Sequence, residues 1–316
     1  MSEQTPDELE DGGGHWFAGK TVDVLIYKVN RRPIEADLNV FQPPADALEH
    51  LFAVLYQQRR PIKSGRRHQR EWRVGNLQMD APAGTIVGML GWSRSGEVLT
   101  NVWDEEAAEW RDEVVASEAS GVAPFAFLKD DRFLGVLKHP SFTENTVQWV
   151  LTEMLNRAEQ YDRMPAVVWA VEPVGDPGEF FAWLDQAESV TELKFVFERP
   201  NPDGEEAFNE LFQRLDRLEA DKIRETITAR DPEVGLSKEG LTSDRVTRGF
   251  IMAAMAAFGF VVGKAYRGGK KVTYDQRQQA LREPVENVSP DWPAATRDVL
   301  GAVRRVTQRR GRNTNG

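Results

Sequence analysis

The sequence predicts an α+β protein, with two domains of mostly antiparallel sheet and packed helices. Short runs of alternating apolar residues recur along the chain, helical patterns stand between them, and several runs are joined by turns too short for parallel strands. A chain of 316 residues, 41% of them hydrophobic, is long enough to build two cores. We expect a disordered tail over 1–18, a first domain over 19–160, a second over 161–285, and a C-terminal helix with a basic tail over 286–316.

The first domain shows a strand, a helix and then two hairpins. Residues 21–30 alternate as in a strand, and residues 44–58 place apolar side chains at helical spacing after Pro44. Residues 70–79 and 85–92 predict paired strands turning at 81–84, and residues 123–139 predict a second hairpin. Ser141 and Glu144 have the spacing of a capping box, which predicts a helix after Ser141.

The second domain alternates strands and helices. Residues 165–173 and 190–198 predict strands on either side of a helix over 178–187, and residues 203–227 predict one long amphipathic helix. Residues 235–244 are typical of a linker, after which Asp244 caps a helix over 246–258. Residues 260–276 predict a hairpin that turns at Gly268 and Gly269, and residues 295–310 predict a final helix. This order favours helices over one face of the sheet.

Several function classes are excluded or disfavoured. The chain has no Cys, its four His residues are far apart in sequence, and residues 259–264 have the wrong spacing for a phosphate-binding loop. We therefore expect no catalytic residues, no metal and no cofactor. The acidic start lacks the features of a signal peptide, and the uncharged run 249–263 is too short to span a bilayer, so we expect a cytoplasmic protein.

Charge is distributed unevenly along a chain whose net charge is −10. Residues 103–119 hold seven acids and one Arg, whereas residues 59–73 hold seven bases and one acid, Glu71. A second basic cluster lies at 264–277 and a third at 304–312. Because local charge decides which polyelectrolyte can dock, the net negative charge does not exclude nucleic acid.

Two basic segments are candidates for contacts with the phosphates of double-stranded DNA. The hairpin can press several cations against a backbone, and its candidate residues are Lys264, Tyr266, Arg267, Lys270 and Lys271. The earlier segment is a mostly arginine loop, and its candidates are Arg59, Arg60, Lys63, Arg66, Arg67, Arg70 and Arg73. The alternatives are a lysine-protected sheet edge for the hairpin and, for the loop, neutralisation by the acidic segment.

The chain resembles the RexA-like phage exclusion proteins of temperate phages over much of its length. The similar stretches are 37–41, 123–151, 192–200 and 261–274, the last containing VVGKAYRGGKKVTY. The resemblance implies a two-domain homodimer that binds double-stranded DNA without sequence preference. It also implies a role in prophage-encoded defence against superinfection, with a separate membrane protein as partner. Lys264 matches the family's basic strand residue, whereas Tyr266 stands where a second base is expected, which leaves the DNA path open.

Two other classes of function remain as alternatives. Glu192 and Lys194 alternate with apolar residues on one strand and, with Asp176 or Asp185, match the chemistry of a metal-dependent nuclease. Alternatively, the basic clusters bind an acidic protein partner. The preferred hypothesis is a non-enzymatic, dimeric DNA-binding protein.

Overall fold

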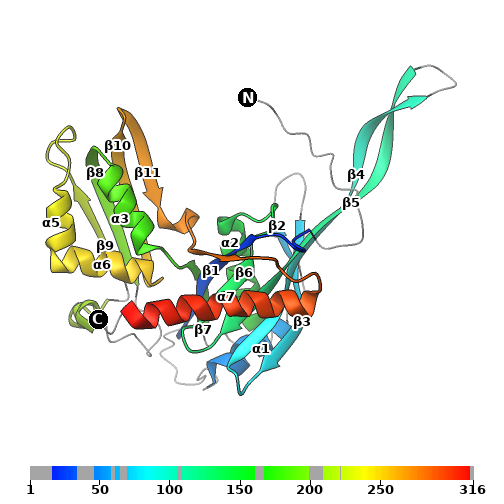
Figure 1. The fold of residues 1–316 in the computed structure, drawn as a ribbon, viewed down its shortest axis with the longest axis horizontal. Helices are drawn as coiled ribbons and strands as arrows, with labels where there is room; N and C mark the ends of the chain where they lie inside the picture. The colour runs from blue at the N-terminus through cyan, green and yellow to red at the C-terminus, as the bar shows by residue number, and fades with distance from the viewer. Residues whose placement is uncertain are drawn as a thin grey trace.

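The chain folds into two antiparallel sheets, each packed against helices (Figure 1). The computed structural model describes residues 16–33, 46–57, 61–64, 70–104, 109–160, 167–198, 209–220 and 222–313; for 32–33, 95–104, 109–119, 209 and 311–313 it describes only the backbone. The predicted α+β class with two sheet-rich domains is confirmed.

The first sheet has eight strands and packs with three helices. Its path is β12–β1–β6–β5–β4–β3–β2, and β7 also pairs with β1. The strands are β1 (Val22–Pro33), β2 (Ile62–Ser64), β3 (Arg70–Asp80), β4 (Thr85–Asp104), β5 (Glu109–Leu128), β6 (Phe133–Leu137), β7 (Val167–Pro173) and β12 (Arg282–Val285). The helices are α1 (Ala47–Tyr56), α2 (Glu144–Glu159) and α7 (Trp292–Asn313).

The second sheet has four strands in the order β11–β10–β8–β9. The strands are β8 (Ser189–Glu198), β9 (Lys222–Thr228), β10 (Gly259–Arg267) and β11 (Lys270–Asp275). The accompanying helices are α3 (Pro177–Gln186), α4 (Asn209–Arg217), α5 (Lys238–Ser243) and α6 (Arg245–Met255), and a 3₁₀ turn, η2 (Gln276–Gln278), follows β11. The chain leaves the first sheet after β7 and returns to it at β12.

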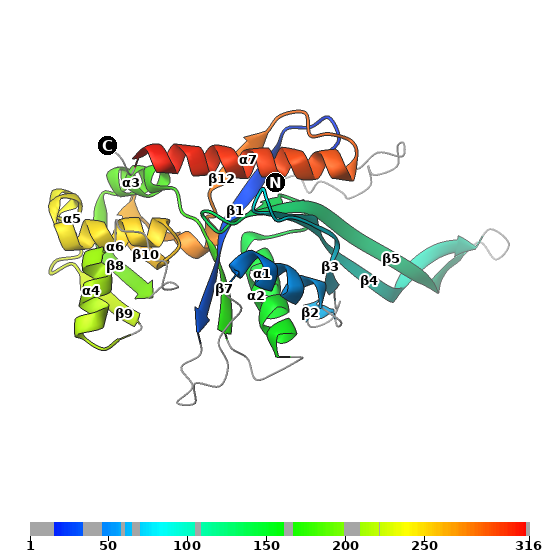
Figure 2. The same ribbon diagram turned by 90° about the horizontal axis from the view of Figure 1, so that it is seen from below.

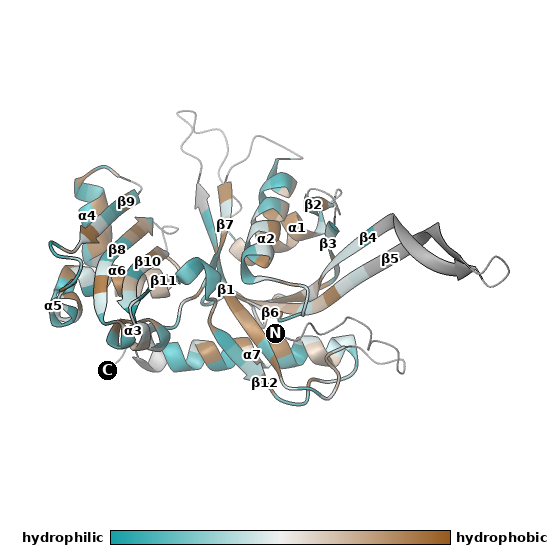
Figure 3. Cartoon of the chain, turned by 90° about the horizontal axis from the view of Figure 1, so that it is seen from above, coloured by the Kyte–Doolittle hydropathy of each residue, from teal (hydrophilic) through white to brown (hydrophobic). Residues whose placement is uncertain are grey.

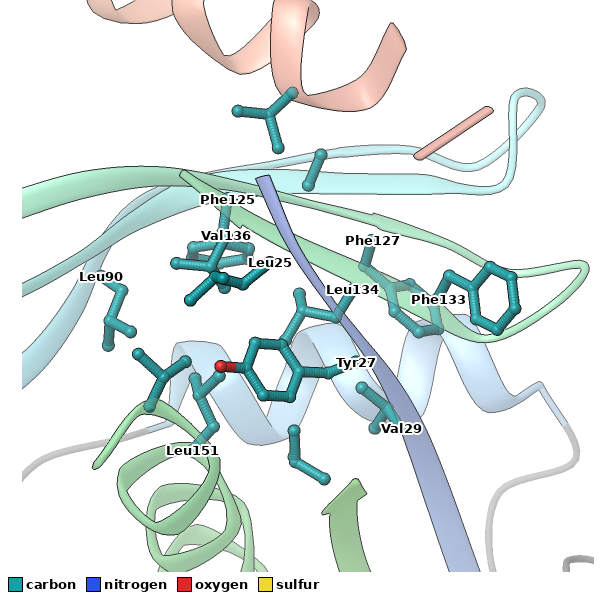
Figure 4. Packing of buried hydrophobic residues seen from close by; sticks show 14 of the residues in the cluster. Leu25, Tyr27, Val29, Leu90, Phe125, Phe127, Phe133, Leu134, Val136 and Leu151 are labelled. Carbon is teal, nitrogen blue, oxygen red and sulfur yellow. The ribbon is translucent and has the colours of Figure 1, made fainter. Parts of the chain in front are cut away.

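The first sheet is covered on both faces, whereas the second is covered on one. Leu25 and Tyr27 pack with Leu134 and Val136 on the side of α2 (Figure 4). On the other side, Val24 and Gly135 meet Val299 and Val303 of α7, whose apolar and polar residues alternate in bands along the helix (Figure 3). Residues 24–30 of β1 are therefore all buried. The expectation of helices over one face holds only for the second sheet.

Polar contacts join the two sheets. On β1, Asn30 donates to Glu172 Oε2 (2.8 Å) on β7 and to the Ala257 carbonyl (3.1 Å) after α6. Arg310 of α7 donates to the carbonyls of Gly175 (2.7 Å) and Met255 (3.1 Å). Because Met255 ends α6, the guanidinium lies where the helix dipole favours a cation.

Four local expectations differ from the structure. β7, although beyond residue 160, belongs to the first sheet, so the second sheet-rich unit begins later than expected. The stretch 203–227, expected as one helix, contains the shorter helix α4 and then the strand β9. Helix α4 ends before Glu219, which has a positive φ. The expected linker contains α5. Helix α2 is capped by Thr143 and not by Ser141.

Asp244 caps α6 as predicted, with its side chain accepting a 2.7 Å hydrogen bond from the Thr247 amide.

Across the described residues, every helix is too short or too polar to cross a membrane.

Gly259, at the start of β10, should tolerate no side chain. Its φ is +139°, and a Cβ there would overlap the Val196 carbonyl oxygen. We expect Gly259→Ala to lower the free energy of unfolding by about 1–3 kcal/mol through backbone strain. The overlap with the Val196 carbonyl oxygen adds to this loss. Urea denaturation measures this. Gly249→Ala in α6 is the control, because its Cβ would meet Leu211 at an ordinary 3.8 Å and Ala stabilises a helix. Equal effects of both changes would contradict the prediction.

Candidate nucleic-acid interface

The second sheet has one face buried by helices and one face exposed to solvent. Leu193, Phe195 and Phe197 of β8 and Val261 of β10 are buried with residues of α3, α4 and α6, and α3 and α6 lie in front of the strands in Figure 1. Because successive side chains of a strand point to opposite faces, the residues between these lie on the other face. The strand register aligns them across the sheet.

We call this exposed side the basic face. It contains six cations and three acids: Lys194, Lys222, Arg224, Lys264, Lys271 and Arg277, with Glu192, Glu198 and Asp275. Threonines 226, 228 and 273 and the side chains of Phe260, Val262 and Tyr266 also belong to it, together with Val196, which is buried although it lies on this face. Six bases against three acids give this face a net charge of +3, in a chain whose total is −10.

Three of the cations are paired within the face. Lys264 Nζ lies 2.9 Å from Glu192 Oε1, and Lys222 contacts Glu198. Arg277 contacts Asp275 at 2.6 Å and covers the Phe260 ring, 4.6 Å from its centroid. Partial burial raises the pKa of Asp275, but the hydrogen bonds and charge of Arg277 outweigh burial and hold that pKa below its ordinary value. Asp275 therefore stays ionised at neutral pH and fixes the guanidinium.

The other three cations are available to a ligand. Lys194, Arg224 and Lys271 are exposed, and none forms an ion pair with another described residue. They come from β8, β9 and β11, so they are spread across the face. A polyanion lying across the strands would meet all three.

The predicted hairpin is confirmed as β10 and β11, but its candidate residues divide between two sides. Tyr266 lies opposite Lys271 and, with Lys264, belongs to the basic face. Arg267 and Lys270 lie opposite each other one residue further on, so alternation directs them to the other side at the tip. All except the half-buried Tyr266 are exposed.

The Gly268–Gly269 turn already holds an anion of the same chain. Both glycines have positive φ, and their amides face the carboxylate of Glu188, at 2.9 Å for Gly268 and 3.4 Å for Gly269. Consecutive amides of this kind form a site for negatively charged oxygen. Glu188 thus offsets part of the positive charge at the tip.

The arginine segment lies elsewhere. Arg59, Arg60, Arg66 and Arg67 are outside the described residues. Lys63 and Arg73 both contact Glu71, at 3.5 and 2.8 Å. Arg70 donates to the Ser141 carbonyl (3.0 Å) and covers the Trp92 ring at 4.2 Å. These three cations on β2 and β3 therefore have structural partners.

The structure does not bring the two predicted segments together. β2 and β3 form one edge of the first sheet, whereas β10 and β11 belong to the second, on the other side of β1 and β7 (Figures 1 and 2). The C-terminal arginines are also separate. Arg305 and Arg309 contact Glu283, and Arg310 binds the carbonyls at the junction of the sheets.

Four cations of the basic face were not among the predicted DNA contacts: Lys194, Lys222, Arg224 and Arg277, the last of which was placed only in the basic cluster at 264–277. Lys222 and Arg224 were expected on a helix, and Lys194 was considered only for a nuclease. Residues 222–228, KIRETIT, contain the pattern that could have indicated β9. Ile223 and Ile227 are an even number of positions apart, so they lie on one face of a strand, with Lys222, Arg224 and the threonines on the other.

The nuclease residues are not assembled in the described part of the chain. Glu192 and Lys194 share the basic face, but Asp176 and Asp185 belong to the cap and body of α3, which packs on the opposite face. Asp176 accepts a 2.7 Å hydrogen bond from the Gly178 amide. Within the described ranges, no three His, Asp or Glu side chains are grouped to hold a metal ion.

The fold and this surface define an α+β protein with a basic, helix-free sheet face. Residues 94–289 match DUF4747, a domain of unknown function. Because the match covers more than half of the chain, the protein belongs to the DUF4747 family. The matched segment includes the strands of the basic face and does not include residues 59–73. No curated protein and no solved structure matches the chain.

The surroundings of Arg70 predict a pH-dependent stability. Burial, and then the charge of Arg70, lowers the pKa of His139 to about 4, from about 6.5 in an unfolded chain. Between these values the unfolded chain binds a proton that the folded protein excludes. Stability should therefore be full above pH 6.5 and fall as the pH decreases toward 4.

Urea denaturation at pH 7 and pH 5 tests this. His139→Asn should show a smaller loss at pH 5, since Asn does not titrate and offers an acceptor to Ser141, whose amide and hydroxyl lie 3.0 and 2.7 Å from His139 Nδ1. The same pH dependence in both proteins would assign the effect to other groups.

Proposed function

We propose that this protein binds the phosphate backbone of double-stranded DNA, without sequence preference, through the basic face. The observation that supports this most strongly is the set of three exposed cations, Lys194, Arg224 and Lys271, on three strands of one open face. The paired cations can exchange a carboxylate for a phosphate, since surface ion pairs contribute only about 0–1 kcal/mol. Threonine hydroxyls between them supply further donors to phosphate oxygens.

The composition of the face favours a duplex over a single strand. Proteins that bind single strands stack bases on exposed aromatic rings. On this face the Phe260 ring is already covered by Arg277, which leaves Tyr266 as the stacking group among the described residues. Contacts to phosphates carry little sequence information, so the binding is nonspecific.

The proposed cellular role comes from the sequence resemblance and not from the basic face. Action as a homodimer in prophage-encoded exclusion, with a separate membrane protein, rests on the resemblance to RexA-like proteins alone. The arginine segment stays a predicted second contact, since four of its residues are outside the described ranges.

Replacement of the three available cations tests the proposal. For Lys194→Ala, Arg224→Ala and Lys271→Ala combined, we expect weaker binding to several unrelated duplexes. The slope of log affinity against log salt should decrease in size by about 2.7. For the unchanged protein, six neutralised phosphates predict a loss of about a thousandfold between 50 and 200 mM salt. Fluorescence anisotropy measures both quantities.

The matched control replaces by Ala three exposed cations that lie outside the second sheet: Lys20, before β1, and Arg297 and Arg304 of α7. It changes the net charge equally and should leave the affinity nearly unchanged. Equal losses in both variants would show a general charge effect and contradict the assignment of the face. Cleavage of the duplex with magnesium or manganese would support the nuclease instead.

A substitution at the hairpin tip should increase the affinity for the duplex. Glu188→Ala removes a carboxylate and frees the amides of Gly268 and Gly269, so we expect duplex affinity at low salt to increase about two- to fivefold. Glu239→Ala, which removes an exposed acid on α5, is the control. If Glu188→Ala binds no more tightly than this control, the tip does not contact the backbone.

A further inference from the structure

The outer parts of β4 and β5 form a two-stranded ribbon beyond the first sheet. β3 pairs with β4 only as far as Ser93, and β6 pairs with β5 only from Phe125. From Arg94 to Asp104 and from Glu109 to Ala119, the two strands pair only with each other among the described residues. We call these two segments the arm. Eleven residues per strand reach about 35 Å, and the arm projects away from the rest of the molecule (Figures 1 and 2).

A ribbon of this length needs a partner. An isolated two-stranded ribbon is at best marginally stable in water, because each strand has one unpaired edge and neither face is packed. The arm also contains Leu99, Trp103, Trp110 and Val114, residues that favour buried surfaces. Its sequence therefore fits a surface that becomes covered.

The register divides the arm into two faces of different composition. Trp103 lies opposite Trp110, Leu99 opposite Val114, and Asn101 opposite Asp112, so all six positions share one face. Glu97 and Glu118 occupy further positions on it, which gives three acids and no base. The other face has the positions of Asp104, Glu109 and Glu113, but also those of Arg94 and Arg111.

The first of these faces complements the basic face of the second sheet. Three acids among large apolar residues match Lys194, Arg224 and Lys271 beside Phe260, Val262 and Tyr266. A surface with this excess of carboxylates repels nucleic acid, which disfavours DNA as the arm's own ligand.

The arm cannot reach the basic face of its own chain. It extends from the first sheet on the side opposite to the second sheet (Figures 1 and 2). A second copy of the chain supplies the same basic face without this constraint. If each arm docks on the other copy, a two-fold axis closes the assembly as a dimer.

We infer that the acidic arm of one chain docks on the basic face of a second copy, and that the two copies exchange arms in a closed dimer. This inference does not depend on DNA binding, because the assembly forms without any other ligand. It also has a consequence for ligands: a polyanion and the arm compete for the same cations.

A charge exchange tests the docking. The arm variant combines Glu97→Lys, Asp112→Lys and Glu118→Lys, and the face variant combines Lys194→Glu, Arg224→Glu and Lys271→Glu. Each variant alone places like charges at both contacts, so sedimentation at micromolar concentration should show monomers. Mixed in equal amounts, they should form a heterodimer, since the reversed arm meets the reversed face and the native arm meets the native face. The unchanged protein should be a dimer that dissociates as salt increases.

The control reverses Lys20, Arg297 and Arg304 to Glu, and this variant should remain dimeric. A monomeric unchanged protein would overturn the inference, and so would two dimeric variants or a mixture that stays monomeric. A variant in which residues 95–118 are replaced by a short turn gives an independent result if the charge variants fold poorly. It should be monomeric, with the circular dichroism of a folded protein. Since all of these measurements are made without DNA, their outcome is separate from that of the proposed function.

Discussion

The burial of one side of β8 and β10 determines the surface of the second sheet. Leu193, Phe195, Phe197 and Val261 lose contact with water against α3, α4 and α6, and burying each such side chain contributes about 1.5–3 kcal/mol. Because side chains alternate, this burial directs Lys194 and Lys264 to the opposite face. A shift of one residue would place lysines in the core, so the core fixes the charge pattern of the surface.

The connection between the two sheets gives this surface a defined place in the molecule. The segment that carries the second sheet leaves after β7 and returns at β12, and both strands pair along the same edge of β1. Asn30 and Arg310 bind carbonyls at the end of α6. Buried polar groups are costly unless they are paired, so this junction favours a single arrangement. The arm and the basic face accordingly lie toward opposite ends of the protein, which favours contacts between copies.

The periodic patterns in the sequence predicted most helices and strands. They failed where contacts with distant segments determined the secondary structure or the burial of a segment. Residues 260–276 turn at Gly268 and Gly269, whose positive φ suits glycine, and Asp244 caps α6. In contrast, KIRETIT follows an amphipathic helix, and it becomes a strand because the free edge of β8 pairs with it. β1 was expected to alternate, but α7, more than 250 residues later, covers its other face. The arginine segment showed a concentration of charge, yet Glu71, Ser141 and Trp92 engage three of its cations.

The sequence by itself determined the α+β class, the order of most elements and the presence of local basic clusters, because these depend on residues close together in the chain. Only the tertiary structure decided which cations share a face. Lys194, Arg224 and Lys271 are brought together by strand pairing over up to 77 residues of sequence, and no local pattern encodes that pairing. It also decided that β4 and β5 continue past their neighbours as an arm, because the length of a ribbon depends on where the adjacent strands end.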